Sequence, residues 1–168
     1  MKVYISGKIG EEVISDATRR KFARAEEMLR AKGYEVFNPA DEKWQQIVQA
    51  GARIEKKCYD VEPYNYILSR DIEKMTRCDA VYFLEDWRQS PGAKAEYYFT
   101  LATGMRMLFE NVMCARDYLE RNYYKLVAAG NPPVQREDGE NDLDVRDKYI
   151  KRHLDEAWLP IAGKEGSV

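Results

Sequence analysis

An aspartate stands in the middle of an apolar helical stripe, an unusual place for a charge. At about 100° per residue, Asp71 falls on the same helix face as Tyr64 and Met75. A carboxylate that points into an apolar face costs several kcal/mol unless it is paired or lines a polar cavity. Asp71 therefore pairs with a neighbour such as Arg70 or Arg77, lies where the helix end leaves the core, or belongs to a functional cavity.

A glutamate near the start of a later helix is the second candidate. Ser90-Pro91 predicts the helix start, and Gly92 precedes Glu96 by one turn, leaving space beside it. The N-terminal end of a helix favours an ionised carboxylate by about 0.3–1 kcal/mol, which predicts a nucleophile rather than a proton donor. The competing interpretation is a solvated surface charge, and Lys94 either points away from Glu96 or neutralises it.

A glycine-containing loop follows the first predicted strand. In Ser6-Gly7-Lys8-Ile9-Gly10, the glycines allow backbone N–H groups to approach an anion, and Lys8 adds positive charge. The loop matches neither the GxGxxG nor the P-loop pattern, so it indicates phosphate or sugar binding only in general terms. A plain strand-to-helix turn is the alternative.

Apolar periodicity predicts the scaffold for these residues, with strands alternating with helices. Strands are expected at 3–5, 34–37 and 80–84, with a short fourth at 107–109. Helices are expected from residue 16 to Gly33, over 41–57 with an irregularity at Gly51, and over 63–75, 90–104, 112–129 and an amphipathic segment from Tyr149 to Trp158. Residues 85–89 and 135–147 are expected to be polar loops, and the chain from Gly163 onward a frayed end.

This order of elements predicts an α/β fold. We expect a three-layer Rossmann/flavodoxin-like domain with a mostly parallel sheet of four to five strands over residues 1–130, and a charged loop with a helical C-terminal extension over 131–168. Such sheets bind ligands beyond the carboxyl ends of their strands, so residues 6–10, 38–41 and 85–96 are expected to meet at one site. Asn38 and Trp87 are candidate binding residues for this reason.

Charge and composition narrow the class of ligand. The chain has 27 basic and 29 acidic residues and no long basic run, which disfavours nucleic acid and favours a small molecule. Cys58, Cys78 and Cys114 have no CxxC spacing and the first residues lack a signal-peptide pattern, so we expect a reducing, cytoplasmic setting. No apolar run approaches the length of a membrane span. His153, the single histidine, is expected to be packed or interfacial, and we assign no metal site.

Several short segments, in their order and spacing, resemble the nucleoside 2-deoxyribosyltransferase-like superfamily, especially its small bacterial and phage members. They are YISG at 4–7, GYEVFNP at 33–39, RD at 70–71, CDAV at 78–81 and SPGAKAE at 90–96. The resemblance covers about residues 1–108.

The resemblance implies an enzyme that cleaves or transfers the N-glycosidic bond of a 2′-deoxynucleoside. Glu96 would attack C1′ of the deoxyribose and form a glycosyl-enzyme, Asp71 would help to bind the substrate and assist at the sugar or departing base, and Tyr4 would contribute to the pocket. The resemblance implies no metal or organic cofactor. It also implies a homodimer or higher homo-oligomer whose subunits share active sites.

Ser90 bears on the choice of substrate. Transferases that act on free nucleosides resemble one another in having an acidic residue six positions before the nucleophile, whereas the similar 2′-deoxynucleoside 5′-phosphate N-hydrolases have a serine there. A phosphate is repelled by a neighbouring carboxylate but not by a hydroxyl group or a helix N-terminus. The serine at this position therefore leads us to expect a 5′-monophosphate as substrate. Alternatively, Ser90 is only an N-cap.

Hydrolysis and transfer both stay open at this stage. The competing function is a non-catalytic nucleotide-binding or sensing module of the same fold, and a third possibility is an interaction protein with a vestigial pocket. The residues expected to bind the substrate are Ser6, Gly7, Lys8, Gly10, Asn38, Trp87, Ser90 and Gly92.

Overall fold

The computed structural model describes residues 1–10 and 14–161, and the chain forms two compact units. The first unit is Met1–Arg106 and the second begins at Met107. The predicted boundary after residue 130 differs from this division, because the helix that begins at Val112 packs on the last helix of the chain. The end expected to fray, from Gly163 onward, lies outside the described residues.

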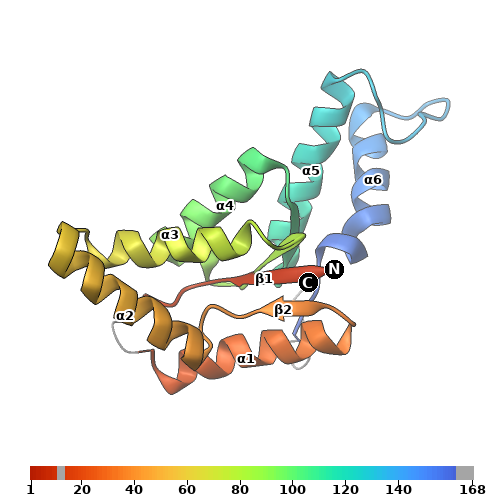
Figure 1. Ribbon diagram of the computed structural model, residues 1–168. Helices are drawn as coiled ribbons and strands as arrows, with labels where there is room; N and C mark the ends of the chain where they lie inside the picture. Colours follow the sequence, from red (N-terminus) through yellow and green to blue (C-terminus); the bar gives the residue numbers. More distant parts are fainter. Residues whose placement is uncertain (11–13, 162–168) are drawn as a thin grey trace. The chain divides into compact units, whose positions relative to one another are not determined.

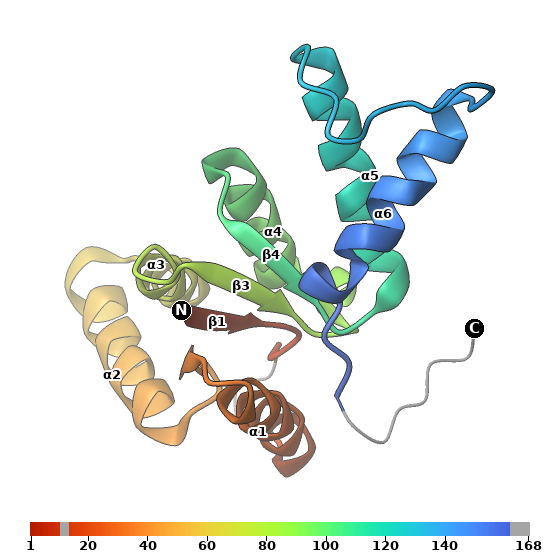
Figure 2. The same cartoon turned by 90° about the vertical axis from the view of Figure 1, so that its right-hand side faces the viewer.

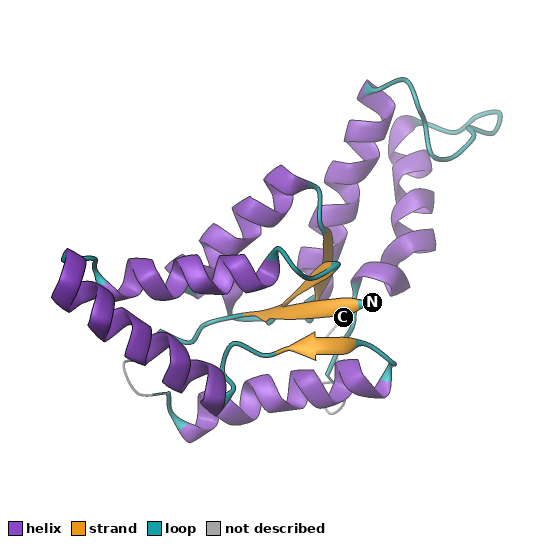
Figure 3. Cartoon of the chain, viewed as in Figure 1, coloured by secondary structure: helices purple, strands orange, loops and turns teal. Residues whose placement is uncertain are grey.

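Strands and helices alternate along the chain, as predicted (Figures 1 and 3). The elements are β1 (Lys2–Ser6), α1 (Asp16–Ala31), β2 (Glu35–Phe37), α2 (Glu42–Tyr59), α3 (Pro63–Met75), β3 (Ala80–Phe83), the 3-10 helix η1 (Trp87–Gln89), α4 (Pro91–Thr103), β4 (Arg106–Phe109), α5 (Val112–Ala128) and α6 (Asp142–Ala157). The short helix η1 replaces part of the loop expected at 85–89.

The four strands form one parallel sheet in the order β2-β1-β3-β4. Val3 of β1 is in register with Val36 of β2 on one side and with Ala80 of β3 on the other. In Figure 1, α1 lies below β1 and α3 lies above it, so helices cover both sides of this part of the sheet. The predicted α/β fold with a parallel sheet and a helical extension is confirmed.

Local capping signals place the helix ends. The Ser90 hydroxyl accepts a hydrogen bond from the Ala93 N–H and Pro91 occupies the first turn, which starts α4 where the sequence predicts. Gly104 ends α4 with φ of 71°, a left-handed conformation that glycine adopts without a steric penalty.

Gly51 does not interrupt α2, contrary to the irregularity expected there. The helix is continuous, and a Cβ at residue 51 would lie 2.4 Å from the hydroxyl oxygen of Tyr66 on α3. The glycine therefore permits α2 and α3 to pack closely, which is a tertiary requirement that helix propensity alone does not reveal.

In the second unit, α5 and α6 lie side by side (Figures 1 and 2). Tyr149 of α6 packs against Tyr123 of α5 and against His153, in agreement with a packed histidine. The loop expected to extend to residue 147 ends earlier, because Asn141 and Asp144 form a capping box that begins α6 at Asp142. Within the described part of the chain, no helix has both the length and the apolar character needed to cross a membrane.

The close packing of Gly51 against Tyr66 predicts that Gly51→Ala changes the stability of the protein in opposite directions with and without the Tyr66 side chain. In the native background, Gly51→Ala forces Tyr66 to move and is expected to destabilise the protein by about 1 kcal/mol or more. In a Tyr66→Ala background, the same change is expected to stabilise by up to about 1 kcal/mol, because alanine favours helix. Urea unfolding of the four proteins measures the coupling, and equal effects in both backgrounds would contradict the packing role.

Candidate active site

A cavity of about 740 Å³ lies in the first unit, beyond the carboxyl end of β1. Its lining includes Gly7, Ile9 and Gly10 after β1, Pro39 after β2, and Ser90 to Ala93 at the start of α4. The three segments that the sequence places at one site, residues 6–10, 38–41 and 85–96, therefore each contribute to this cavity. The lining also includes Tyr4, Asp71 and Glu96.

Helix α2 forms a cavity wall that sequence reasoning missed, and α3 contributes further residues besides the predicted Asp71. They contribute Gln45, Gln49, Ala52 and Arg53 from α2, and Pro63, Tyr64, Ile67 and Leu68 from α3. The available signal was the spacing of residues 45, 49, 52 and 53, which places them on one face of a helix. The stripe that contains Asp71 thus faces the cavity, which explains why Tyr64 is exposed.

Glu96 is buried at the cavity and held by two hydroxyl groups of β1. Its side chain comes from the second turn of α4, and the residue is only 6% exposed. The Tyr4 hydroxyl donates to Oε1 at 2.7 Å, and the Ser6 hydroxyl donates to Oε2 at 2.5 Å. Both carboxyl oxygens are therefore oriented by the inner strand of the sheet.

Burial raises the pKa of Glu96 to about 8, against the lowering effect of the hydrogen bonds from Ser6 and Tyr4. The negative charge of Asp71 raises it further. This contradicts the expectation of an ionised carboxylate, because Glu96 is mainly protonated at neutral pH. The reason is that the helix-dipole effect falls off within the first turn, whereas Glu96 is the sixth residue of α4 and is desolvated.

Asp71 is the second buried carboxyl group of the cavity, at 7% exposure. Its Oδ1 accepts a hydrogen bond from the indole Nε1 of Trp44 at 2.7 Å. Burial raises the pKa of Asp71 to about 6, although the Trp44 hydrogen bond lowers it. The alternative of a pairing with Arg70 or Arg77 is wrong, because both of these arginines bind Glu73.

Tyr4 is fully buried, and its hydroxyl donates a hydrogen bond to Glu96. Burial, followed by the charges of Glu96 and Asp71, raises its pKa well above the ordinary value of tyrosine. The phenol therefore stays protonated and acts as a hydrogen-bond donor to Glu96 throughout the physiological pH range.

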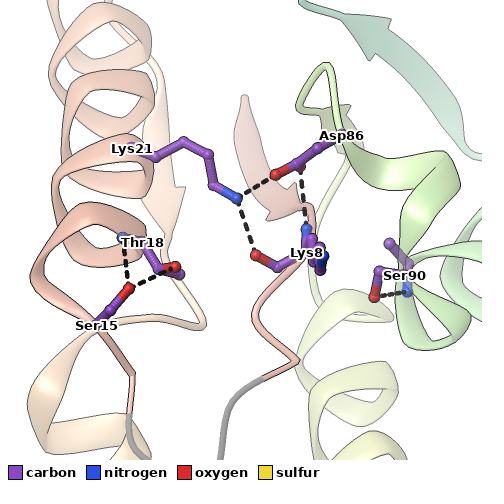
Figure 4. A network of polar contacts seen from close by, with 7 residues as sticks. Lys8, Ser15, Thr18, Lys21, Asp86 and Ser90 are labelled. Atoms are coloured by element: carbon purple, nitrogen blue, oxygen red, sulfur yellow. Dashed lines mark hydrogen bonds and ion pairs between the residues drawn. The ribbon is translucent and has the colours of Figure 1, made fainter.

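Lys8 holds the loop after β1 in place through its backbone, and its charge does not enter the cavity (Figure 4). Its N–H donates to Asp86 Oδ1 at 3.1 Å, and its carbonyl oxygen accepts from Lys21 Nζ at 2.9 Å. Lys21 and Asp86 also form an ion pair with each other. The exposed Lys8 side chain is not among the groups that line the cavity, whereas its neighbours Gly7 and Ile9 are.

Asn38 and Trp87, which the sequence suggests as binding residues, do not line the cavity. The Asn38 amide donates to Glu26 and its oxygen accepts from the Ala40 N–H, so this side chain shapes the turn after β2. Trp87 is buried and stacks on Tyr97 with ring centroids 4.4 Å apart. Both side chains therefore support the fold near the site.

The small residues around the cavity have packing roles as well. A Cβ at Gly7 would lie 2.7 Å from Cδ1 of the buried Leu84, and a Cβ at Gly92 would lie 3.1 Å from the Tyr64 hydroxyl oxygen. Ser90 caps α4, as its alternative interpretation holds, and also lines the cavity. Lys94 is exposed and does not line the cavity with Glu96.

Metal ligands are not grouped in the described part of the molecule. Within residues 1–10 and 14–161, no three His, Cys, Asp or Glu side chains are placed so that they could hold a metal ion. The ionisable residues that line the cavity are Asp71 and Glu96, both buried, together with Tyr4, Tyr64 and Arg53.

The comparisons with known proteins give one family. A family model described as "Domain of unknown function (DUF4406)" matches residues 1–109, a range that includes every residue of the cavity. No curated protein and no solved structure matches the chain.

The buried Glu96 predicts a pH-dependent stability. Because its pKa is about 8 in the folded protein and near 4.5 without the surrounding structure, the folded state holds an additional proton between these values. Its contribution to stability is complete below about pH 4.5 and is lost as pH rises through 8.

Urea unfolding at pH 5, 6.5 and 8.5 tests this prediction with Glu96→Gln, which cannot titrate. The free energy of unfolding of the native protein is expected to fall relative to this variant by on the order of a few kcal/mol over the range. Glu27→Gln, at an exposed position of α1, serves as control and is expected to parallel the native protein. Parallel curves for Glu96→Gln would contradict a buried, protonated Glu96.

Proposed function

We propose that this chain, which belongs to the DUF4406 family, cleaves the N-glycosidic bond of a 2′-deoxynucleoside 5′-monophosphate through a covalent intermediate on Glu96. One observation carries the proposal: Glu96 and Asp71, which are distant in the sequence, are both buried and line one cavity together with Tyr4. The resemblance to nucleoside 2-deoxyribosyltransferases and 2′-deoxynucleoside 5′-phosphate N-hydrolases supports this reaction class.

In the first step, the Glu96 carboxylate forms a bond to C1′ of the deoxyribose while the bond from C1′ to the base nitrogen breaks. The electron pair of the broken bond stays on the base, which takes a proton from Asp71. Tyr4 and Ser6 hold the attacking carboxylate in place. The products of this step are the free base, a deoxyribosyl ester of Glu96 and an ionised Asp71.

In the second step, water or a second base attacks C1′ and the bond to Glu96 breaks. Asp71 accepts a proton from the attacking group, which restores the starting state. Water gives hydrolysis and a second base gives transfer, so both reactions use the same residues.

The protonation of the two carboxyl groups sets a requirement for this chemistry. Between about pH 6 and 8 the two carboxyl groups together hold one proton, and this proton is mainly on Glu96. The proposed first step uses the other arrangement, in which Glu96 is ionised and Asp71 is protonated. The two carboxyl groups must therefore carry one proton in total, and substrate binding must shift this proton from Glu96 to Asp71.

The cavity suits a nucleotide in size and character. Its volume of about 740 Å³ lies within the usual range for small-ligand sites. Ile67 and Leu68 provide apolar surface for a base, and Ser90 at the start of α4 provides a neutral, phosphate-compatible position. The free cysteines support a cytoplasmic setting, and a homo-oligomer with shared active sites stays a prediction.

A non-catalytic nucleotide-binding module is the second candidate function. The high pKa of Glu96 favours it, because a protonated carboxyl group binds ligands as a neutral donor without attacking them. Binding of deoxynucleoside monophosphates without release of base would support this alternative.

Removal of the nucleophile gives the first test of the proposed reaction. We expect the native protein to release free base from one or more 2′-deoxynucleoside 5′-monophosphates, and Glu96→Gln to reduce kcat at least about 1,000-fold. Liquid chromatography of the released base over a panel of nucleosides and monophosphates provides the measurement. The control Glu27→Gln is expected to retain native turnover, and unchanged turnover in Glu96→Gln would remove the mechanism.

The pH profile gives the second test. Because the reaction needs one proton on the carboxyl pair, kcat/KM is expected to be bell-shaped, with limbs near pH 6 and 8. Tyr4→Phe removes a hydrogen bond to ionised Glu96 and is expected to move the upper limb by about one pH unit to higher pH. An upper limb that stays in place would show that Tyr4 does not stabilise the Glu96 carboxylate.

A further inference from the structure

The hydrogen bond between Trp44 and Asp71 has a definite direction. An indole nitrogen can donate a hydrogen bond but cannot accept one, so Asp71 Oδ1 must be the acceptor. A proton on Oδ1 in the plane of this contact would meet the indole N–H. Oδ2 has no hydrogen-bond partner among the described residues and is the oxygen left for a ligand in the cavity.

Contacts other than Asp71 fix the orientation of Trp44. The side chain of Asp41 caps α2 by accepting the Trp44 backbone N–H at 3.1 Å. The Trp44 ring packs edge-on against Phe37, with centroids 5.3 Å apart, and Lys74 Nζ lies 4.9 Å from the ring centroid. Trp44 is thereby only 8% exposed, and its N–H is aimed before any ligand arrives.

We propose that Trp44 is a positioning residue for Asp71: its indole N–H holds Oδ1 as an acceptor and confines the exchangeable proton of Asp71 to Oδ2. This inference rests on the proposed function for its catalytic consequence, because Oδ2 then delivers the proton to the departing base. The confinement of the proton is a property of the protein alone and is measurable without turnover.

Several charged or titratable groups lie on the elements around this pair. They are Tyr4 on β1, Arg53 on α2, Tyr64 and Lys74 on α3, and Glu96 on α4. Tyr4 stays protonated and Glu96 titrates near pH 8, so a transition near pH 6 belongs to Asp71. The hydrogen bond makes Trp44 the reporter of that transition.

Fluorine NMR of the native protein labelled with 5-fluorotryptophan tests the contact directly. The chain has three tryptophans, and the Trp44 signal, identified by its absence in Trp44→Phe, is expected to shift with a midpoint near pH 6. Asp71→Asn is expected to abolish this shift. Trp87 serves as an internal control, because it is equally buried and its Nε1 has no partner in the described structure. A Trp44 signal that does not titrate, or that still titrates in Asp71→Asn, overturns the proposal.

The pH profile of base release tests the catalytic consequence. Trp44→Phe keeps an aromatic ring but removes the donor, so the acid limb of kcat/KM is expected to rise by about one pH unit and kcat to fall about tenfold. Trp87→Phe removes an N–H without a partner and is expected to move neither.

If Trp44→Phe is active and the acid limb of its kcat/KM profile stays at the native pH, the positioning role is wrong. If the native protein releases no base, the proposed function fails while the fluorine titration still decides the inference. That titration is carried out on protein that keeps Trp44, so it reports the contact in the native fold.

Discussion

Desolvation of the Glu96 carboxyl group is the constraint on which the rest of the site depends. A carboxylate that leaves water loses hydration free energy, and hydrogen bonds restore only part of it. Tyr4 and Ser6 each donate to one oxygen of Glu96, yet burial still raises its pKa to about 8. The molecule therefore keeps a group in its cavity that gains or loses a proton near neutral pH.

The position of β1 makes this arrangement possible. Tyr4 and Ser6 are two residues apart in a strand, so their side chains point to the same face of the sheet. Pairing with β2 and β3 on either side holds both hydroxyls in place. Helix α4 presents Glu96 to them, and the Ser90 cap sets where that helix begins. A rigid strand thus orients an acid that comes from a distant part of the chain.

The two carboxyl groups differ in pKa mainly because Glu96 is the more completely desolvated and is also raised by the charge of Asp71, which outweighs the two hydrogen bonds that it accepts. Asp71 accepts a hydrogen bond from an indole that can only donate, and it retains a lower pKa than Glu96. A pair that holds one proton across the neutral range is chemically suited to the proposed glycosyl transfer and also to the binding of a polar ligand. The apolar residues Ile67 and Leu68 line the same cavity as the two carboxyl groups.

Local patterns in the sequence alone determined the alternation of strands and helices, the Ser90 cap and the place of the cavity, because periodicity and capping act over a few residues. They also marked Asp71 as anomalous, since a charge in an apolar stripe is visible without a structure. Only the tertiary structure decided the protonation of Glu96, the contact of Trp44 with Asp71 and the structural role of the Lys8 backbone. Burial and hydrogen bonding between residues far apart in the chain set these properties, and no local spacing encodes them.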